Sequence, residues 1–321
     1  MGISIIGDGE IPNIKIIGVG GAGGNAINYM IDAKLPGVEF FAVNTDSQGI
    51  DHSKAETKIQ IGFKITDGLG AGANPRIGRD AAIECIQEIK TALGGSNMAL
   101  IIAGLGGGTG TGAAPVVAEI CKEMGILTVA VVSKPFAFEG KKRMAQADMG
   151  LQALRLLTDI VIVIPNDRLR SFTPKNATIL EMFKMVDETI YHTVKGITDL
   201  IMLPCLVNIG FDDLKSNMNK GQIVSMGIGS ATGKNRAKEA VEKAICHPLI
   251  EDILISGARG VLINIISGSD LELEEMTEAT ELIYKKVGED AEIIWWQSID
   301  ENIGDEMRFI VAVVPNQLDR S

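Results

Sequence analysis

The chain has few cysteines and histidines, and their placement excludes several kinds of site. The four cysteines stand far apart, at Cys85, Cys121, Cys205 and Cys246. None forms a CxxC pair, so we expect neither a zinc site nor a disulfide framework. Reduced thiols in apolar surroundings, as in a reducing compartment, are the simpler interpretation. The three histidines all lie outside the glycine-rich loops, which leaves those loops without an obvious catalytic imidazole.

The sequence also lacks an excess of positive charge and any long apolar run. Its net charge of −11 and pI of about 4.9 argue against nucleic acid as a partner. No stretch approaches the roughly 18 apolar residues of a membrane span, and the N-terminus has no basic region typical of a secretory signal. With 321 residues and 46% hydrophobic content, the chain is long enough for about two globular domains. An acidic protein of this kind repels its own copies, so any self-assembly should depend on salt and divalent cations.

The most informative segment is residues 104–115, which read GLGGGTGTGAAP. This glycine-rich loop lies between an apolar run at 98–103 and a helical pattern at 113–124. Glycine lets the backbone approach an anion closely, and the N–H groups at the start of a helix point at it. No lysine follows the glycines, so the GxxxxGK[ST] loop of the P-loop NTPases is excluded. The segment therefore predicts a phosphate-binding loop of another type.

Apolar strands alternate with amphipathic helices in the first half of the chain. The predicted strands are 13–19, 38–43, 100–103, 126–132 and 160–164, and the predicted helices are 24–32, 75–93 and 141–157. This alternation predicts an α/β fold with a parallel, doubly wound sheet. Ligands bind such sheets at the carboxyl ends of the strands, where the glycine-rich loops of this chain fall.

A long helix is predicted at 177–202, and a second α/β region follows it from about residue 210. The predicted strands there are 221–229, 260–266, 291–296 and 307–314, with helices at 233–246 and 271–287. The last two strands are joined by a turn-rich segment at 300–305, which suggests that they pair in an antiparallel manner.

The first glycine-rich loop, residues 18–25, leaves two classes of ligand open. It satisfies GxGxxG after a strand, with Asp46 as a possible downstream acid, which is the dinucleotide-binding pattern of an NAD-dependent oxidoreductase. That enzyme would need a catalytic His or Lys in the cleft. Two glycine-rich loops around one pocket are better suited to a nucleoside triphosphate, because a dinucleotide fold needs only one.

The loop at 104–110 resembles, nearly letter for letter, the GGGTGTG signature of the tubulin and FtsZ family of self-assembling GTPases. Four further loops, 42–46, 68–75, 134–143 and 164–169, match the family in order and spacing. The resemblance implies a Rossmann-type parallel-sheet GTP-binding domain joined by a long central helix to a smaller α/β domain. The implied divisions are 1–176 for GTP binding, 177–209 for the central helix and catalytic loop, and 210–321 for the second domain.

The resemblance also implies a site for GTP or GDP with Mg²⁺. The residues carried over to it are Gly20, Gly21, Gly23, Gly24, Asn25, Asn44, Thr45, Ala71, Gly72, Ala73, Gly106, Gly107, Gly108, Thr109, Gly110, Thr111, Pro135, Glu139, Arg143, Asn166, Phe183 and Asp187. Glu139 would contact ribose, Arg143 the phosphates or sugar, and Asn166 the guanine. Phe183 would stack on the ring, and the Asp187 carboxylate could accept from guanine N1–H and N2–H₂ together.

Each of these side chains also has a purely structural interpretation. Phe183 lies on the apolar face of the predicted helix and could belong to the core. Asp187 could be a solvated helix residue. Glu139 and Arg143 are spaced i, i+4 and could form a surface ion pair of little energetic value.

In this family, a loop of the neighbouring subunit completes the hydrolytic site. The loop has the pattern N-x-D-F-x-D, and here it reads Asn208-Ile-Gly-Phe-Asp-Asp213, so its first acid is replaced by Gly210. Asp213 remains, whereas Asp212 is a poor substitute because adjacent helical side chains diverge by about 100°. We hypothesise that nucleotide binding is intact and hydrolysis is weakened. The alternative is that Asn208 and Asp213 suffice, or that Asp212 moves in, and turnover is ordinary.

A site shared between subunits implies head-to-tail contacts, which build open filaments. The resemblance implies a cytoplasmic protein of the mid-cell division site that assembles with itself and, in addition, with a paralogue or division regulators. A slowly hydrolysing or non-hydrolysing filament protein with a role other than division is the alternative. Family members usually continue into a short peptide that binds membrane tethers, and no segment up to Ser321 matches it. Either the sequence is trimmed or this member lacks that peptide, and we expect no direct membrane insertion.

Overall fold

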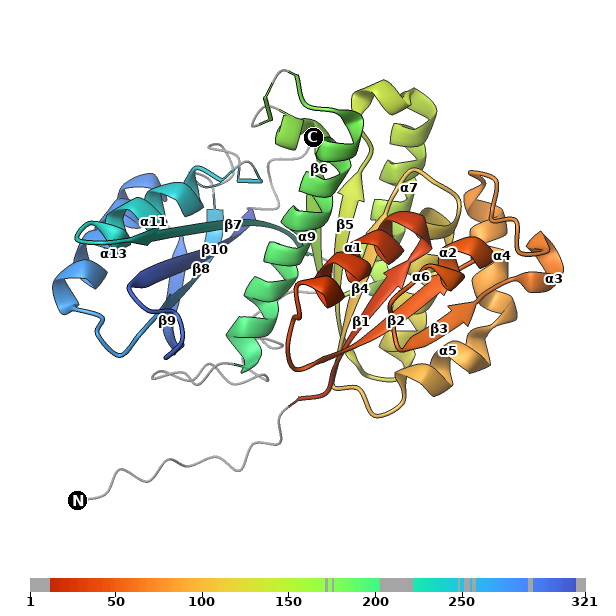
Figure 1. The fold of residues 1–321 in the computed structure, drawn as a ribbon, viewed down its shortest axis with the longest axis horizontal. Helices are drawn as coiled ribbons and strands as arrows, with labels where there is room; N and C mark the ends of the chain where they lie inside the picture. Colours follow the sequence, from red (N-terminus) through yellow and green to blue (C-terminus); the bar gives the residue numbers. More distant parts are fainter. Residues whose placement is uncertain are drawn as a thin grey trace.

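The structure is a computed structural model that describes residues 12–170, 173–174, 176–202, 222–247, 249–250, 255, 258–287 and 291–315. One ten-stranded sheet runs through the molecule in the order β3-β2-β1-β4-β5-β6-β7-β10-β8-β9. Helix α9 (Ile179–Met202) lies between the two halves of the chain (Figure 1). No helix within the described ranges combines the length and the apolar character needed to cross a membrane.

The first half is a parallel sheet, as the sequence predicted. Its strands are β1 (Ile14–Val19), β2 (Val38–Asn44), β3 (Thr57–Gln60), β4 (Met98–Gly104), β5 (Leu127–Lys134) and β6 (Ile160–Pro165). Neighbouring strands pair in parallel throughout, for example Ile14 opposite both Val38 and Met98. The short edge strand β3 was missed, because its four residues contain too little apolar alternation to stand out.

Helices cover both faces of this sheet. They are α1 (Gly20–Asp32), α2 (Ser47–Asp51), α3 (Phe63–Thr66), α4 (Pro75–Glu84), α5 (Ile86–Leu93), α6 (Thr109–Glu123), η1 (Ala137–Glu139), α7 (Lys141–Leu157) and α8 (Asn166–Arg170). Buried side chains place α1 and α9 on one face and α4 to α7 on the other. Each face thus has its own apolar core, and the sheet lies between them.

Three predicted helices differ clearly from the observed ones. Helix α6 begins at Thr109 rather than at residue 113. The helix predicted at 75–93 is interrupted at Cys85, whose φ of −109° and ψ of 23° end α4 and begin α5. Neither Gly nor Pro marks this break, so the sequence carried no signal for it. Helix α1 begins at Gly20 rather than Gly24, directly after strand β1. The glycine-rich loop is therefore largely the first turn of the helix.

The second half forms the other end of the sheet. Its elements are β7 (Gln222–Thr232), α11 (Arg236–Ile245), β8 (Ala258–Ser267), α13 (Leu273–Lys286), β9 (Glu292–Ile299) and β10 (Glu306–Pro315). The predicted pairing of the last two strands is wrong. Strand β10 lies antiparallel between β7 and β8, and β9 pairs in parallel with the outer side of β8. Phe309 and Val311 on β10 are fully buried and require a central position, whereas Trp295 on β9 is 39% exposed, as suits an edge.

The two halves of the sheet are joined by a short seam. Among the residues that the structure describes, strands β6 and β7 pair in parallel over three residue pairs, from Ile160 opposite Gln222 to Ile162 opposite Val224. Helix α9 packs beside this seam through Val186, Ile190, Val194 and Ile197, which are all buried. The long helix predicted from the sequence is therefore confirmed, and its apolar stripe faces the cores of both halves.

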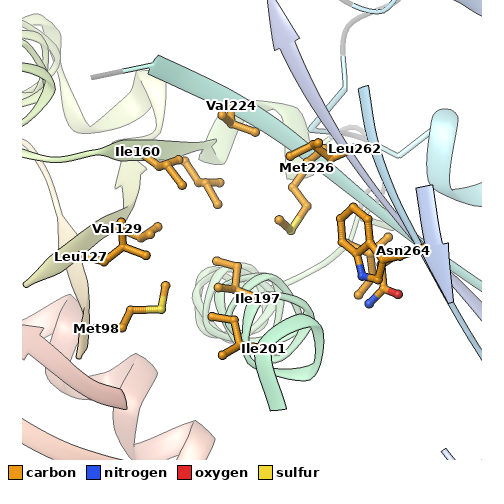
Figure 2. Close-up of a pocket in the computed structure, with 14 residues that line it drawn as sticks. Met98, Leu127, Val129, Ile160, Ile197, Ile201, Val224, Met226, Leu262 and Asn264 are labelled. Carbon is orange, nitrogen blue, oxygen red and sulfur yellow. The ribbon is translucent and has the colours of Figure 1, made fainter. Parts of the chain in front are cut away.

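A small cavity lies between α9 and the sheet (Figure 2). Its volume is about 50 Å³, and its lining is almost entirely apolar, with Met98, Ile197 and Met226 among the side chains. Asn264 and Trp296 are paired across β8 and β9 on its wall. Among the described residues, neither Nδ2 of Asn264 nor Nε1 of Trp296 has an acceptor. These two donors are the polar feature of an otherwise apolar space.

A buried lysine ties β1 to the end of α5. The ammonium of Lys15, a residue 6% exposed, donates to the carbonyl oxygens of Ala92 and Gly94 at 2.8 Å each. It also lies 5.2 Å from the ring centroid of Phe41. A cation at the carboxyl end of a helix satisfies free carbonyls and complements the helix dipole. Lys15 thereby fixes the position of α5 against the sheet.

A second buried cation, on α11, links several elements of the second half of the chain. Arg236, only 4% exposed, donates to both carboxylate oxygens of Glu275 at 2.8 and 3.1 Å. Its Nη1 also lies 2.8 Å from Asp270 and 3.4 Å from Asp305. Hydrogen bonds from Arg236 hold the pKa of Glu275 below its ordinary value. One guanidinium thus links α11, α13 and the turn before β10.

Replacing Arg236 with alanine should lower the free energy of unfolding by about 2–4 kcal/mol, because Glu275 would stay partly buried without its partner. Urea unfolding followed by circular dichroism measures the change. The matched control is Lys238→Ala, at an exposed position on the same helix, which should shift stability by less than about 0.5 kcal/mol. Equal effects of the two substitutions would contradict a structural role for the buried guanidinium.

Candidate nucleotide site

A pocket of about 270 Å³ opens at the carboxyl ends of β1, β4 and β5. Two helices begin at its floor, α1 directly after β1 and α6 shortly after β4. The lining residues are Val19, Gly21, Ala22, Gly104, Leu105, Gly107, Gly108, Thr109, Gly110, Ser133, Pro135, Glu139, Arg143, Asn166 and Phe183. Two helix N-termini present free N–H groups and positive dipole ends to one space, which favours an anion such as phosphate.

Glycine is required where the two loops touch. A Cβ on Gly110 would lie 2.3 Å from the carbonyl oxygen of Gly104. Gly20 has a φ of +73°, and a Cβ there would lie 2.9 Å from the amide nitrogen of Gly110. A side chain at either position would clash with backbone, so the close approach of α1 and α6 depends on both glycines.

Threonine hydroxyls fix the shape of the signature loop. Thr111 Oγ1 accepts a hydrogen bond from the backbone N–H of Gly106 at 2.9 Å. The hydroxyls of Thr45 and Thr109 lie 2.7 Å apart, and Thr45 is fully buried. The Thr66 hydroxyl lies within hydrogen-bonding distance of the Thr45 carbonyl oxygen, at 3.3 Å. The Thr109 hydroxyl at the pocket is thus oriented from the loop that follows β2.

The loop at 68–74 rests on the same part of the site. The backbone N–H of Ser47 donates to the Gly68 carbonyl at 3.0 Å, and Leu69 forms an antiparallel bridge with Asp46. Ala71 is buried, and a Cβ on Gly108 would lie 2.7 Å from the Ala71 Cβ. The loop therefore packs directly against the start of α6.

Aromatic and amide side chains form the other end of the pocket. Phe183 meets Phe136 edge to face at a centroid distance of 5.6 Å, and Phe138 stacks on Phe136 at 5.1 Å. Phe183 is 42% exposed and lines the pocket, so it is not a core residue. Asn166 is buried, and its Oδ1 has no partner in the part of the chain that the structure describes. A flat ring and an unsatisfied amide suit a planar heterocyclic base.

Glu139 and Arg143 line the pocket between these two ends. They form an ion pair at 2.6 Å, so the i, i+4 pairing considered from the sequence is present. Glu139 also accepts from the backbone N–H of Phe136 at 2.9 Å, which holds the carboxylate in place. The Arg143 side chain is half exposed and can turn toward a ligand without losing buried packing.

Asp187 lies one helical turn beyond Phe183 on α9, on the same side of the helix. It does not line the pocket itself. Burial raises the pKa of Asp187 from 3.8 to about 7. A partly buried carboxylate near an aromatic pocket is a candidate reader of a base, since its ionised form accepts two hydrogen bonds.

The structure thus gathers ten of the predicted residues into the pocket lining. These are Gly21, Gly107, Gly108, Thr109, Gly110, Pro135, Glu139, Arg143, Asn166 and Phe183. The other predicted residues of the described chain are not part of the pocket lining. They lie in helix α1, near the ends of β2 and α3, in the signature loop and on α9. These residues are Gly20, Gly23, Gly24, Asn25, Asn44, Thr45, Ala71, Gly72, Ala73, Gly106, Thr111 and Asp187.

Five lining residues were not named among the predicted site residues, although all but Ser133 lie in the two predicted glycine-rich loops: Val19, Ala22, Gly104, Leu105 and Ser133. Ser133 was detectable, because a polar residue near the carboxyl end of a buried strand points to a ligand site. The predicted catalytic residues Asn208, Asp212 and Asp213, and the substituted position Gly210, lie outside the residues that the structure describes.

A preformed metal cage is absent from the described part of the chain, where no group of three or more His, Cys, Asp or Glu side chains is placed to hold an ion. Mg²⁺ is usually held by substrate phosphates and waters with only one or two protein oxygens. The Thr109 hydroxyl lines the pocket beside the phosphate loop and is one such oxygen, and the fully buried Thr45 hydroxyl, 2.7 Å from it, fixes its position.

The fold and the pocket define a nucleotide-binding α/β protein, with phosphates expected over the helix starts and a base near α9. Comparison with known proteins specifies the class further. Residues 13–174 match the family described as "Tubulin/FtsZ family, GTPase domain", and residues 222–316 match "FtsZ family, C-terminal domain". The chain therefore belongs to the tubulin/FtsZ family.

Individual relatives agree with this assignment. The chain is 48% identical over 300 residues to "Cell division protein FtsZ" of Coxiella burnetii, covering 94% of this chain and 78% of the relative. The structure titled "FtsZ dimer, empty (M. jannaschii)" matches with a TM-score of 0.85 and 44% identity, over 95% of this chain and 89% of that one. A CetZ1 structure from Haloferax volcanii, with 20% identity and a TM-score of 0.80 over 95% of each chain, shares the fold.

The family assignment settles the class of activity. The chain is a GTPase of the FtsZ type, and its nucleotides are GTP and GDP. The alternative of an NAD-dependent oxidoreductase, which rested on the first glycine-rich loop alone, is thereby excluded.

Proposed function

We propose that the pocket holds GTP with its guanine between Asn166 and Phe183 and its phosphates over the first turns of α1 and α6. One observation carries this proposal: a single pocket joins two glycine-rich helix starts at one end to an exposed aromatic ring and a buried amide at the other. A nucleotide has the same polarity, with anionic charge at one end and a planar ring at the other.

We assign roles to the site residues from their positions along the pocket. The N–H groups of Gly107, Gly108 and Gly110 would contact phosphate oxygens, and Glu139 and Arg143 would lie beside the sugar. Asp187 would read guanine in its ionised form. The remaining predicted glycine, asparagine, alanine and threonine positions would shape the surrounding loops. Mg²⁺, held mainly by the phosphates, would neutralise their charge and help to stabilise the transition state for phosphoryl transfer.

We further propose that the protein assembles head to tail and that hydrolysis is completed between subunits. The described pocket contains one carboxylate, Glu139, and it is already engaged by Arg143 and the Phe136 N–H. A carboxylate to orient the attacking water would come from segment 208–213 of the next subunit, with Asn208, Asp213 and, by movement, Asp212 as candidates. The M. jannaschii FtsZ relative is described as a dimer, which supports self-association.

The proposed cellular role is division, since the Coxiella burnetii relative is a cell division protein. On this proposal the chain acts in the cytoplasm at the mid-cell division site, with itself, a paralogue and division regulators as partners. We propose the divisions 1–176, 177–209 and 210–321 for the nucleotide domain, the central helix with its loop, and the second domain.

Gly210 favours a second candidate, a filament protein that hydrolyses GTP slowly and forms stable polymers in another role. Both candidate functions use the same nucleotide-site residues among those that the structure describes. The two differ in the rate of turnover and in the lifetime of the filaments.

Phosphate release from GTP with Mg²⁺, measured over a range of protein concentrations together with pelleting, tests both candidates. GTP-dependent pelleting above a critical concentration with little phosphate release, the result expected if Gly210 weakens the loop, would support the second candidate. Release that rises steeply with pelleting would instead show that the shared site is complete despite Gly210. Failure to pellet with GTP would contradict the assembly proposal.

A further inference from the structure

We propose that Gln146 on α7 is a positioning residue for the triphosphate: it holds the loop at 68–74 against the phosphate end of the pocket. This inference rests on the proposed function. The side-chain amide of Gln146 donates to the carbonyl oxygen of Ala73 at 3.2 Å, joining segments 73 residues apart. Gln146 follows Arg143 by three residues on the same helix, so both side chains leave α7 on the same side. One helix therefore supplies a pocket residue and a contact to the loop.

The loop is anchored at both ends and conformationally unfavourable between them. At its start, the Ser47 N–H donates to the Gly68 carbonyl at 3.0 Å. At its end, the Asn74 side chain caps α4 by accepting from the Arg76 N–H at 3.1 Å. Ala73 lies just before that cap with a φ of +56°, a left-handed conformation that an L-residue with a Cβ rarely adopts. A fixed partner for the Ala73 carbonyl stabilises this conformation, and Gln146 provides one.

The position of the loop determines which part of the nucleotide it senses. Helices α3 and α4, which flank the loop, lie near the β3 edge of the sheet, whereas α9 lies between the two halves of the chain (Figure 1). Phe183, which lines the pocket, is on α9. The loop touches the start of α6 through Ala71 and Gly108. A nucleotide with its base at Phe183 would direct its last phosphate toward this loop. The Gln146 contact should therefore distinguish a triphosphate from a diphosphate.

The test substitution is Gln146→Met, which keeps the length and helix propensity of the side chain and removes its N–H donors. The matched control is Gln152→Met, at an exposed position further along the same helix. Fluorescent GTPγS and fluorescent GDP are bound to the monomer, below the assembly concentration, and their release is followed by stopped-flow mixing. Thermal unfolding of each nucleotide-free variant verifies that it is folded.

We expect Gln146→Met to release GTPγS about 3- to 10-fold faster than the wild type, the value of one hydrogen bond. GDP release should stay within about twofold, because GDP has no γ-phosphate for the loop to hold. Gln152→Met should match the wild type with both nucleotides. Equal acceleration of GTPγS and GDP release, or no change in either, would overturn the positioning role. A wild-type protein that binds neither nucleotide would instead overturn the proposed function, and this inference with it.

Discussion

Replacement of Asp187 by asparagine is expected to weaken GTP binding by about 10²- to 10³-fold, the usual effect of losing a charge-assisted pair of hydrogen bonds. The ionised carboxylate accepts from both N1–H and N2–H₂ of guanine, whereas the asparagine NH₂ would face the guanine N2–H₂ as a second donor. Xanthine has a carbonyl oxygen at that position. Asp187→Asn should therefore bind xanthosine triphosphate more tightly than GTP, reversing the preference of the wild type.

The same carboxylate should make nucleotide affinity depend on pH. Burial raises its pKa to about 7 in the free protein, so the carboxylate is about half protonated near neutral pH. The protonated form loses acceptor capacity, so GDP affinity should fall up to tenfold for each pH unit below about 7 and level off above it. Titration calorimetry with GDP from about pH 5.5 to about pH 8.5 measures this dependence. Asp187→Asn should flatten it.

The raised pKa also predicts an effect on stability, with a definite sign. Between about pH 4 and pH 7, the native state binds more protons at this site than the unfolded state, so the free energy of unfolding falls as pH rises. At about pH 8, nucleotide-free Asp187→Asn should therefore be more stable than the wild type, by about 1–3 kcal/mol.

Glu188→Gln is the matched control, a carboxylate-to-amide change at the next and more exposed position of α9. It should leave GTP affinity, its pH dependence and the nucleotide preference within about twofold of the wild type. Asp187→Asn that bound GTP as tightly as the wild type would show that another group reads the base.

Substitution of Gly210 by aspartate is expected to raise GTP turnover in filaments by about 10²-fold or more, the typical contribution of a positioned general base or water-orienting carboxylate. The substitution restores the acid of the family loop pattern three residues before Asp213. This segment lies outside the residues that the structure describes, and the expected effect follows from its sequence pattern. Phosphate release per mole of pelleted protein is the measurement, since it separates catalysis from the amount of assembly.

Gly210→Asn is the control for this substitution, because it adds a side chain of nearly the same size without the charge. It should leave turnover near the wild-type rate, and GTP affinity of the monomer should be the same for all three proteins. Gly210→Asp that assembled normally without faster turnover would contradict the proposed role of the missing acid. Ordinary turnover would then depend on Asn208 and Asp213, or on movement of Asp212 into the site.

Local patterns predicted the parallel half of the fold because its signals are local and strong. The apolar strands and the long stripe of α9 are properties of short windows, and they were placed within a few residues. Cys85, which divides α4 from α5, carries no such signal, since neither Gly nor Pro marks the break. The position of β10 between β7 and β8 likewise depends on which strand buries both faces, and the turn at 300–305 does not encode that choice.

The candidate site was predicted largely from motifs whose chemistry depends on the backbone. The glycines of 104–110 were identifiable because an ordinary turn between a strand and a helix needs far fewer of them. The contact between Thr45 and Thr109, and the packing of Ala71 on Gly108, join loops more than thirty residues apart. The pKa of Asp187 depends on how deeply α9 is covered by the rest of the fold. Neither the loop contacts nor this pKa can be seen in a one-dimensional pattern.

The seam between β6 and β7 has a mechanical consequence. Within the described ranges, six residue pairs join β5 to β6 and eight join β7 to β10, but only three join β6 to β7. A sheet bends most easily where the fewest hydrogen-bonded residue pairs join its strands. The 50 Å³ cavity beside α9 also reduces side-chain packing in the same region. Tension or bending applied across the molecule would therefore be absorbed mainly by rotation about the line of this seam. The phosphate end of the nucleotide pocket, built from elements on one side of this line, would move with that side, whereas Phe183 belongs to α9, which packs beside the seam.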